Sequence, residues 1–208
     1  IRDAKEKAAR TGPAGVQLAW VLNQVAPDAR LGMLGYSYGA RVVSGAAHLL
    51  GGGRLNGAAL PNRDALPDRP VQAVYLAAAL DATWLGPRQA HGCSLRVIDS
   101  LLSSTNRRDP AMCLYPIIAV RRHPAVGYAG PTTLSREYAS KVRLRNLAGS
   151  VGRTHDMCEY MMAPGVMSAA WRRLTFADRP AAPQRLVEVQ PANATDKTGA
   201  KLATRPAQ

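Results

Sequence analysis

Residues 31–50 have the sequence LGMLGYSYGARVVSGAAHLL, and this stretch decides the fold. Its first part, Leu31–Gly35, is apolar and directly follows a Pro27-Asp28 break, so we expect a short buried strand there. From Tyr38 to Leu50, apolar and small residues recur three and four positions apart, which is the spacing of one helix face. The stretch therefore predicts a strand, a tight turn and a helix in immediate succession.

The turn between these elements has the pattern Gly-x-Ser-x-Gly, at Gly35-Tyr36-Ser37-Tyr38-Gly39. In a strand–turn–helix setting, such a serine is placed to act as a nucleophile. We expect a strained backbone at Ser37, with glycines at 35 and 39 because larger side chains would collide there. The N–H of Tyr38 and the helix dipole would stabilise a developing oxyanion. The alternative is that Ser37 is an ordinary helix N-cap; the flanking elements favour the nucleophile.

The rest of the chain alternates predicted strands with helices and long loops. We expect a helix over residues 3–25, interrupted at Thr11-Gly12-Pro13, and helices over His155–Met162 and Val166–Leu174. Strands are expected at Val71–Ala77, Leu95–Leu101 and Lys141–Leu147, the last near a sheet edge. This order predicts an α/β fold with a mostly parallel sheet and flanking helices. Reactive groups in such sheets gather at the carboxyl ends of the strands.

Length and composition fit one domain followed by a tail. The chain has 208 residues, of which 47% are hydrophobic and 20% charged, enough for a sizeable core. We assign residues 1–176 to the domain and 177–208, rich in Pro, Ala and Thr, to a disordered tail. No apolar run approaches the roughly 20 residues of a transmembrane helix. The 3 cysteines are too few and too scattered for a disulfide framework or a zinc site.

The net charge of +13 raises the question of nucleic-acid binding. However, the basic residues are spread from Arg2 to Arg205 with few tight clusters, and aromatic residues make up only 5% of the chain. Stacking platforms for single strands are therefore sparse. We do not expect a nucleic-acid partner.

The strand, the Gly35–Gly39 turn and the following helix resemble the α/β-hydrolase fold family, in its lipase- and esterase-like branch. The resemblance covers about Pro13 to Leu174 and corresponds to the C-terminal half of that fold. It implies a serine hydrolase that acts on an ester or related acyl bond of a small-molecule or lipid-like substrate, without metal or organic cofactor. It also implies that the N-terminal strands and the upstream loop that donates to the oxyanion are missing, which leaves half of the oxyanion hole.

In this family, the catalytic acid and then the histidine follow the serine along the chain. Of the four histidines, His48 lies within the helix after Ser37, His91 is expected at the wrong end of the sheet, and His123 lies in an irregular segment. His155 follows the last predicted strand in a glycine-bearing loop. This position makes His155 the expected general base, with His123 second.

The acid is expected on a loop after an earlier strand. Asp109 follows the third predicted strand and matches the family's acid loop, whereas Asp81 follows the second strand and is the alternative. Asp109 also precedes Pro110, which is the pattern of a helix N-cap, and both roles are compatible. The expected triad is therefore Ser37, Asp109 and His155.

A second hypothesis is a non-catalytic, hydrolase-like domain that binds an acidic partner through an arginine-rich surface. The sequence indicates no oligomeric state, and a cytoplasmic location is expected only if no signal peptide preceded Ile1.

Overall fold

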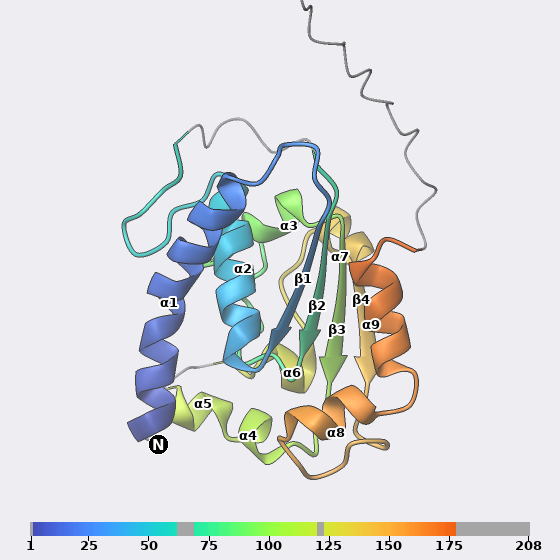
Figure 1. Cartoon of the computed structure of the whole chain (residues 1–208). Helices are drawn as coiled ribbons and strands as arrows, with labels where there is room; N and C mark the ends of the chain where they lie inside the picture. Colours follow the sequence, from blue (N-terminus) through green and yellow to red (C-terminus); the bar gives the residue numbers. More distant parts are fainter. Residues whose placement is uncertain (1, 62–68, 120–122, 178–208) are drawn as a thin grey trace, which may run out of the picture.

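The computed structural model describes residues 2–61, 69–119 and 123–177, and the predicted tail lies outside this part of the chain from residue 178 onward. The described residues form one sheet with helices on both of its faces (Figure 1). In chain order, the elements are α1 (Arg2–Asn23), β1 (Leu31–Tyr36), α2 (Tyr38–Leu50), β2 (Val71–Leu76), α3 (Ser94–Val97), β3 (Ser100–Thr105), α4 (Pro110–Cys113), α5 (Tyr115–Ile118), α6 (Val126–Ala129), α7 (Arg136–Lys141), β4 (Val142–Asn146), α8 (Met157–Met162) and α9 (Val166–Leu174).

The sheet of the described residues has the strand order β1-β2-β3-β4, and all three neighbouring pairs are parallel. This confirms the predicted α/β class and the parallel sheet. Strand β4 pairs with β3 alone and lies at the edge, as expected for the segment Lys141–Leu147. All four strands therefore direct their carboxyl ends to one end of the molecule, where α4, α5 and α8 lie (Figure 1).

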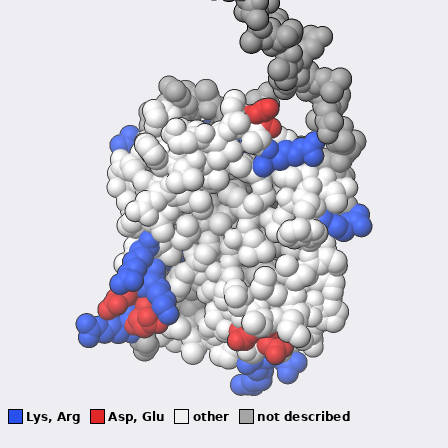
Figure 2. Space-filling view, viewed as in Figure 1, with Lys and Arg blue, Asp and Glu red and all other residues white. Residues whose placement is uncertain are grey.

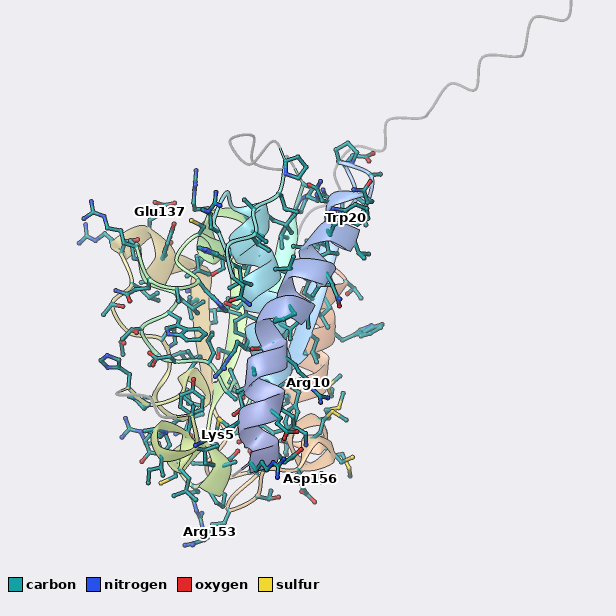
Figure 3. The ribbon with its side chains drawn as sticks, turned by 90° about the vertical axis from the view of Figure 1, so that its left-hand side faces the viewer. Lys5, Arg10, Trp20, Glu137, Arg153 and Asp156 are labelled. Carbon is teal, nitrogen blue, oxygen red and sulfur yellow. The ribbon has the colours of Figure 1, made fainter. Side chains whose placement is uncertain are left out.

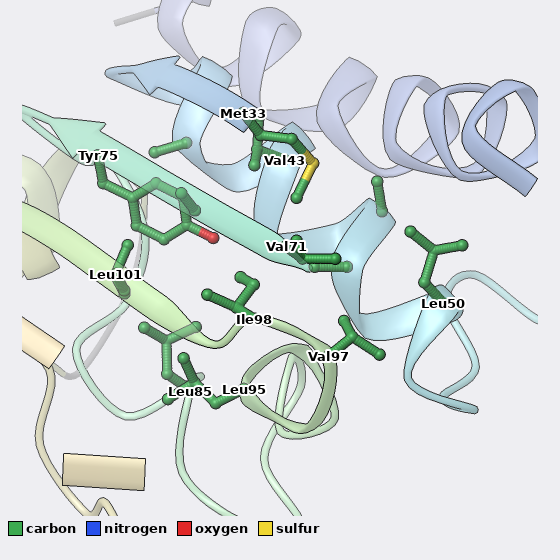
Figure 4. Close-up of a cluster of buried hydrophobic side chains, with 14 of the residues drawn as sticks. Met33, Val43, Leu50, Val71, Tyr75, Leu85, Leu95, Val97, Ile98 and Leu101 are labelled. Atoms are coloured by element: carbon green, nitrogen blue, oxygen red, sulfur yellow. The ribbon is translucent and has the colours of Figure 1, made fainter. Parts of the chain in front are cut away.

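Each face of the sheet buries its own hydrophobic cluster. Alternate side chains of β2, such as Val71 and Tyr75, pack into the larger cluster with α2 and α3, part of which Figure 4 shows. The intervening side chains, Val74 and Leu76, pack instead against the side of the sheet that α8 and α9 cover. Burial on both faces explains why β2 is apolar along almost its whole length.

The predicted third strand, Leu95–Leu101, is wrong in its bounds. The structure places a short helix at Ser94–Val97 and the strand at Ser100–Thr105. The apolar run spans the end of the helix and the start of the strand, and both parts are buried in the same core, so composition alone does not separate them.

The predicted interruption of the first helix is also wrong, since α1 continues through Pro13. A proline inside a helix removes one backbone hydrogen bond and costs about 3 kcal/mol or more. Packing against α2 offsets this cost, because Thr11, Gly15 and Ala19 recur every fourth residue and form a buried stripe on α1. Tertiary contact thus overrides the local break.

The charged side chains do not form one continuous basic patch on the face shown in Figure 2, where they lie mainly around the periphery. Among the described residues, no helix combines the length and apolar character needed to span a membrane.

Candidate active site

Ser37 lies between β1 and α2 in a strained backbone conformation, with φ 50° and ψ −121°. A β-carbon at Gly35 would lie 2.5 Å from the Cα and N atoms of Ala40, so this turn requires glycine there. At Gly39, by contrast, an added β-carbon would meet nothing within 4 Å. The predicted collision of a larger side chain is therefore confirmed at Gly35. It is wrong at Gly39, where a β-carbon has room.

The structure brings the three expected side chains into one hydrogen-bonded chain. His155 Nε2 lies 3.0 Å from Ser37 Oγ, and His155 Nδ1 lies 2.7 Å from Asp109 Oδ2. The three residues come from the ends of β1, β3 and β4, which parallel pairing places at the same edge of the sheet. The Asp109 side chain is fully buried, whereas 24% of the His155 side chain remains exposed. This arrangement is suited to removing a proton from Ser37.

The carboxylate of Asp109 makes two sets of contacts through its two oxygens. Oδ1 accepts hydrogen bonds from the backbone N–H groups of Ala111 and Met112 and so caps α4. Oδ2 faces His155. Asp109 therefore caps α4 and contacts His155 at once, and the cap fixes the carboxylate beside the imidazole.

Tyr160 on α8 is a further member of the site that the sequence analysis missed. Its hydroxyl donates a hydrogen bond of 2.7 Å to Asp109 Oδ2, and its side chain is fully buried. Burial opposes ionisation of Asp109, but hydrogen bonds from His155 and Tyr160 outweigh this effect and lower the pKa of Asp109. Burial, followed by the hydrogen bond to Asp109, raises the pKa of Tyr160, which keeps its proton for this bond.

Among the described residues, none of the other candidates makes a hydrogen bond to Ser37 Oγ. Asp81 accepts hydrogen bonds from the backbone and hydroxyl of Thr83 and makes none to His155. His48 and His91 are buried side by side, with ring centroids 6.0 Å apart. His123 is exposed. The structure thus groups Asp109 and His155 with Ser37, and not the alternatives Asp81 and His123.

A cavity of about 220 Å³ opens beside Ser37 and His155. Its inner walls are mostly apolar, formed by Tyr38, Ala79, Ala111, Met112, Tyr115 and Ile118. The first turns of α1 close one side with an ion pair of 2.7 Å between Asp3 and Lys7. Figure 3 shows the start of α1, at Lys5, at the same end of the molecule as Arg153 and Asp156, which flank His155. No pattern in the sequence predicts that α1 reaches this site.

One backbone N–H at the cavity is suited to binding an oxyanion. The N–H of Tyr38 donates to no acceptor among the described residues, and Tyr38 follows Ser37 at the N-terminus of α2. The N–H groups of Ala79 and Ala111, which also line the cavity, are already engaged by Ser37 O and Asp109 Oδ1. Tyr38 therefore provides a donor beside the nucleophile candidate.

Within the described residues, no group of three or more His, Cys, Asp or Glu side chains is arranged to hold a metal ion. The chain matches no family model, and comparisons with the curated proteins and with the solved structures give no significant match.

Proposed function

We propose that the chain is a serine hydrolase of the α/β-hydrolase type, which cleaves an ester or related acyl bond through an acyl-enzyme. The observation that carries the proposal is the chain of hydrogen bonds from Ser37 through His155 to buried Asp109. The strained backbone of Ser37 supports it, since strain of this kind is maintained mainly at functional sites.

In the first half of the reaction, Ser37 Oγ attacks the acyl carbon of the substrate while His155 Nε2 takes the hydroxyl proton. Asp109 holds the imidazole through Nδ1 and stabilises the imidazolium that forms. The carbonyl oxygen becomes negative and accepts a hydrogen bond from the N–H of Tyr38. The bond from the acyl carbon to the leaving oxygen then breaks, and the alcohol departs with the proton from Nε2.

In the second half, water attacks the acyl-enzyme. His155 Nε2 removes a proton from the water, whose oxygen bonds to the acyl carbon. The bond between that carbon and Ser37 Oγ breaks, and the proton on Nε2 returns to Ser37. A carboxylic acid leaves, and the resting hydrogen bonds reform.

The cavity indicates the kind of substrate. Its apolar inner walls and its volume of about 220 Å³ suit a short aliphatic or aromatic acyl group, without a charge on the part that enters. Asp3 and Lys7, at one side of the cavity, form an ion pair and so add no net charge to its wall. We therefore propose uncharged esters with small acyl groups as substrates.

The direct test is burst kinetics with p-nitrophenyl acetate. Acylation of Ser37 releases p-nitrophenol before turnover, so we expect a burst that approaches one equivalent per chain and disappears in Ser37→Ala. The matched control is Ser168→Ala, which changes an exposed serine on α9 and leaves the burst intact. A folded chain that releases no more p-nitrophenol than Ser37→Ala contradicts the proposal.

A second candidate function is the binding of an acidic partner. It is supported by a hollow of about 340 Å³ lined by Arg107, Arg108 and Arg153, on the loops that also carry Asp109 and His155. Exposed arginines around a hollow favour a carboxylate-rich ligand. Binding of polyglutamate that is lost in Arg107→Glu/Arg153→Glu, with no burst from Ser37, would favour this candidate over the hydrolase.

A further inference from the structure

A second cavity, also of about 220 Å³, lies between α1, α2 and the loop that carries Trp84 and His91. None of its lining residues lines the cavity at Ser37. Its walls include Arg41 on α2 and the turn at Leu55-Asn56, together with Ala8, Ala9, Thr11 and Gly12 of α1. The proposed reaction uses none of these groups.

Arg41 places a positive charge at this cavity, and no described carboxylate pairs with it. The residue is only 5% exposed. Its Nε donates to Ala79 O and its Nη2 to Tyr115 Oη, whereas Nη1 makes no hydrogen bond to a described residue. Nearby aromatic rings, including Tyr38 at 4.9 Å, compensate part of the charge. A buried guanidinium in this state is a site for an anion.

His91 adds a second polar group to the same cavity. It is 3% exposed, and its Nδ1 lies 2.8 Å from the hydroxyl oxygen of Ser44. When Ser44 donates to Nδ1, the ring proton lies on Nε2, which makes no hydrogen bond to a described residue. Burial, followed by the neighbouring His48 and then the charge of Arg41, lowers the pKa of His91 to about 3, so the ring is neutral and can serve as a donor.

The remaining walls are suited to an apolar body with a polar end. Trp84, whose ring lies 5.0 Å from the Arg41 guanidinium carbon, and Leu55 provide apolar surface. Asn56 contributes a side-chain amide beside Gly12, where an added β-carbon would lie 2.2 Å from the amide nitrogen. No acidic residue of the described chain lines this cavity, in contrast to the cavity at Ser37, which Asp3 borders.

We propose that this second cavity binds the carboxylate of a small organic acid, with Arg41 as the charged partner and the hydrocarbon part of the acid against Trp84 and Leu55. A carboxylate matches the flat donor geometry of a guanidinium, and it neutralises a charge that would otherwise remain buried alone. The proposal concerns a different cavity from Ser37, and it holds whether or not the chain hydrolyses esters.

The test measures binding of benzoate and of neutral benzamide to the full chain by isothermal titration calorimetry. We expect saturable benzoate binding, and benzamide binding at least about tenfold weaker because it lacks the charge. Replacing buried Arg41 risks the fold, so the informative variant is Asn56→Asp. Asn56 is exposed and has φ 50°, a conformation that aspartate also tolerates, so the fold is preserved while a negative charge enters the cavity wall.

Asn56→Asp is expected to weaken benzoate binding by about tenfold through charge repulsion. The matched control, Ala59→Asp, adds the same charge at an exposed position of the same segment that does not line the cavity, and benzoate binding should stay within about twofold of wild type. Absence of benzoate binding to the wild-type chain overturns the proposal. Equal binding to wild type and Asn56→Asp also overturns it, because benzoate then binds elsewhere, including the cavity at Ser37.

Discussion

Two serine–histidine pairs lie along α2 and the turn before it, and their surroundings differ. Ser37 Oγ lies 3.0 Å from His155, and Ser44 Oγ lies 2.8 Å from His91. The first pair faces a cavity, and its imidazole is bonded on the far side to Asp109. In the second pair, Ser44 is fully buried, and His91, which lines the second cavity, has no carboxylate partner among the described residues. A short Ser–His distance is therefore not sufficient; the acid and the access to substrate distinguish the proposed nucleophile.

The largest expected effect comes from removing the acid behind His155, so that the Ser37–His155 pair lacks a carboxylate, as the Ser44–His91 pair does. Asp109→Asn removes the negative charge behind His155 but keeps a side chain that can cap α4. We expect the rate of the p-nitrophenyl acetate burst to fall on the order of 10³- to 10⁴-fold, because the imidazole loses its orientation and its counter-charge. Stopped-flow kinetics measures this rate. A burst within about tenfold of wild type would show that Asp109 has no catalytic part.

The second prediction concerns protein stability and the tight turn at Gly35–Gly39, which holds Ser37. Gly35→Ala places a β-carbon against Ala40 and is expected to lower the free energy of unfolding by about 3 kcal/mol. Gly39→Ala is its matched control, since the position is open and helical, and it should be neutral or stabilising by up to about 1 kcal/mol. Urea unfolding measures both. Equal losses in the two variants would mean that the turn differs from the one described.

A smaller effect on the burst rate is expected from removing the Tyr160 hydroxyl, which donates to Asp109. Tyr160→Phe removes a hydrogen bond to Asp109 and should slow the burst by about tenfold. Because this bond lowers the pKa of Asp109, its loss should raise that pKa, which ¹³C NMR of the carboxyl carbon measures. Tyr36→Phe is the matched control, since the buried Tyr36 hydroxyl has no hydrogen-bond partner in the described part. An unchanged Asp109 pKa in Tyr160→Phe, with an unchanged burst rate, would mean that Tyr160 only packs against the site.

The last prediction concerns the Ser44–His91 pair and the dependence of the free energy of unfolding on pH. Burial lowers the pKa of His91 from 6.5 to about 3, so between these values the unfolded chain binds a proton that the folded chain does not. His91 should therefore contribute a fall of up to about 1.4 kcal/mol in the free energy of unfolding for each pH unit below 6.5, in addition to the contribution of His48, whose pKa burial also lowers. Urea unfolding at several pH values measures this slope, which His91→Gln should reduce. An unchanged slope in that variant would indicate that His91 titrates normally.

The parts of the site that the sequence could predict are those set by local pattern. The residues from Gly35 to Gly39 specify the turn, because a tight turn between a strand and a helix restricts the residue types that fit. The expected positions of Asp109 and His155 came from the resemblance, which places the acid and then the histidine on loops after later strands. Their hydrogen bonds to one another agree with that order.

The parts that could not be predicted depend on contacts between distant segments. Tyr160 meets Asp109 across 51 positions of sequence, and no local pattern marks it. Whether α1 continues through Pro13 depends on its packing against α2, and its first turn reaches the cavity only in the folded chain. The run Leu95–Leu101 misled because a buried helix end and a buried strand have the same apolar composition.

The most direct measurement of the central claim is the position of a covalent adduct. The full chain is treated with a fluorophosphonate probe, and the modified peptide is identified by mass spectrometry after digestion. We predict that the probe modifies Ser37 and leaves Ser44 unmodified, because only Ser37 combines a cavity, a general base and a buried acid. A folded chain that carries no adduct, or carries it on Ser44, would contradict the account.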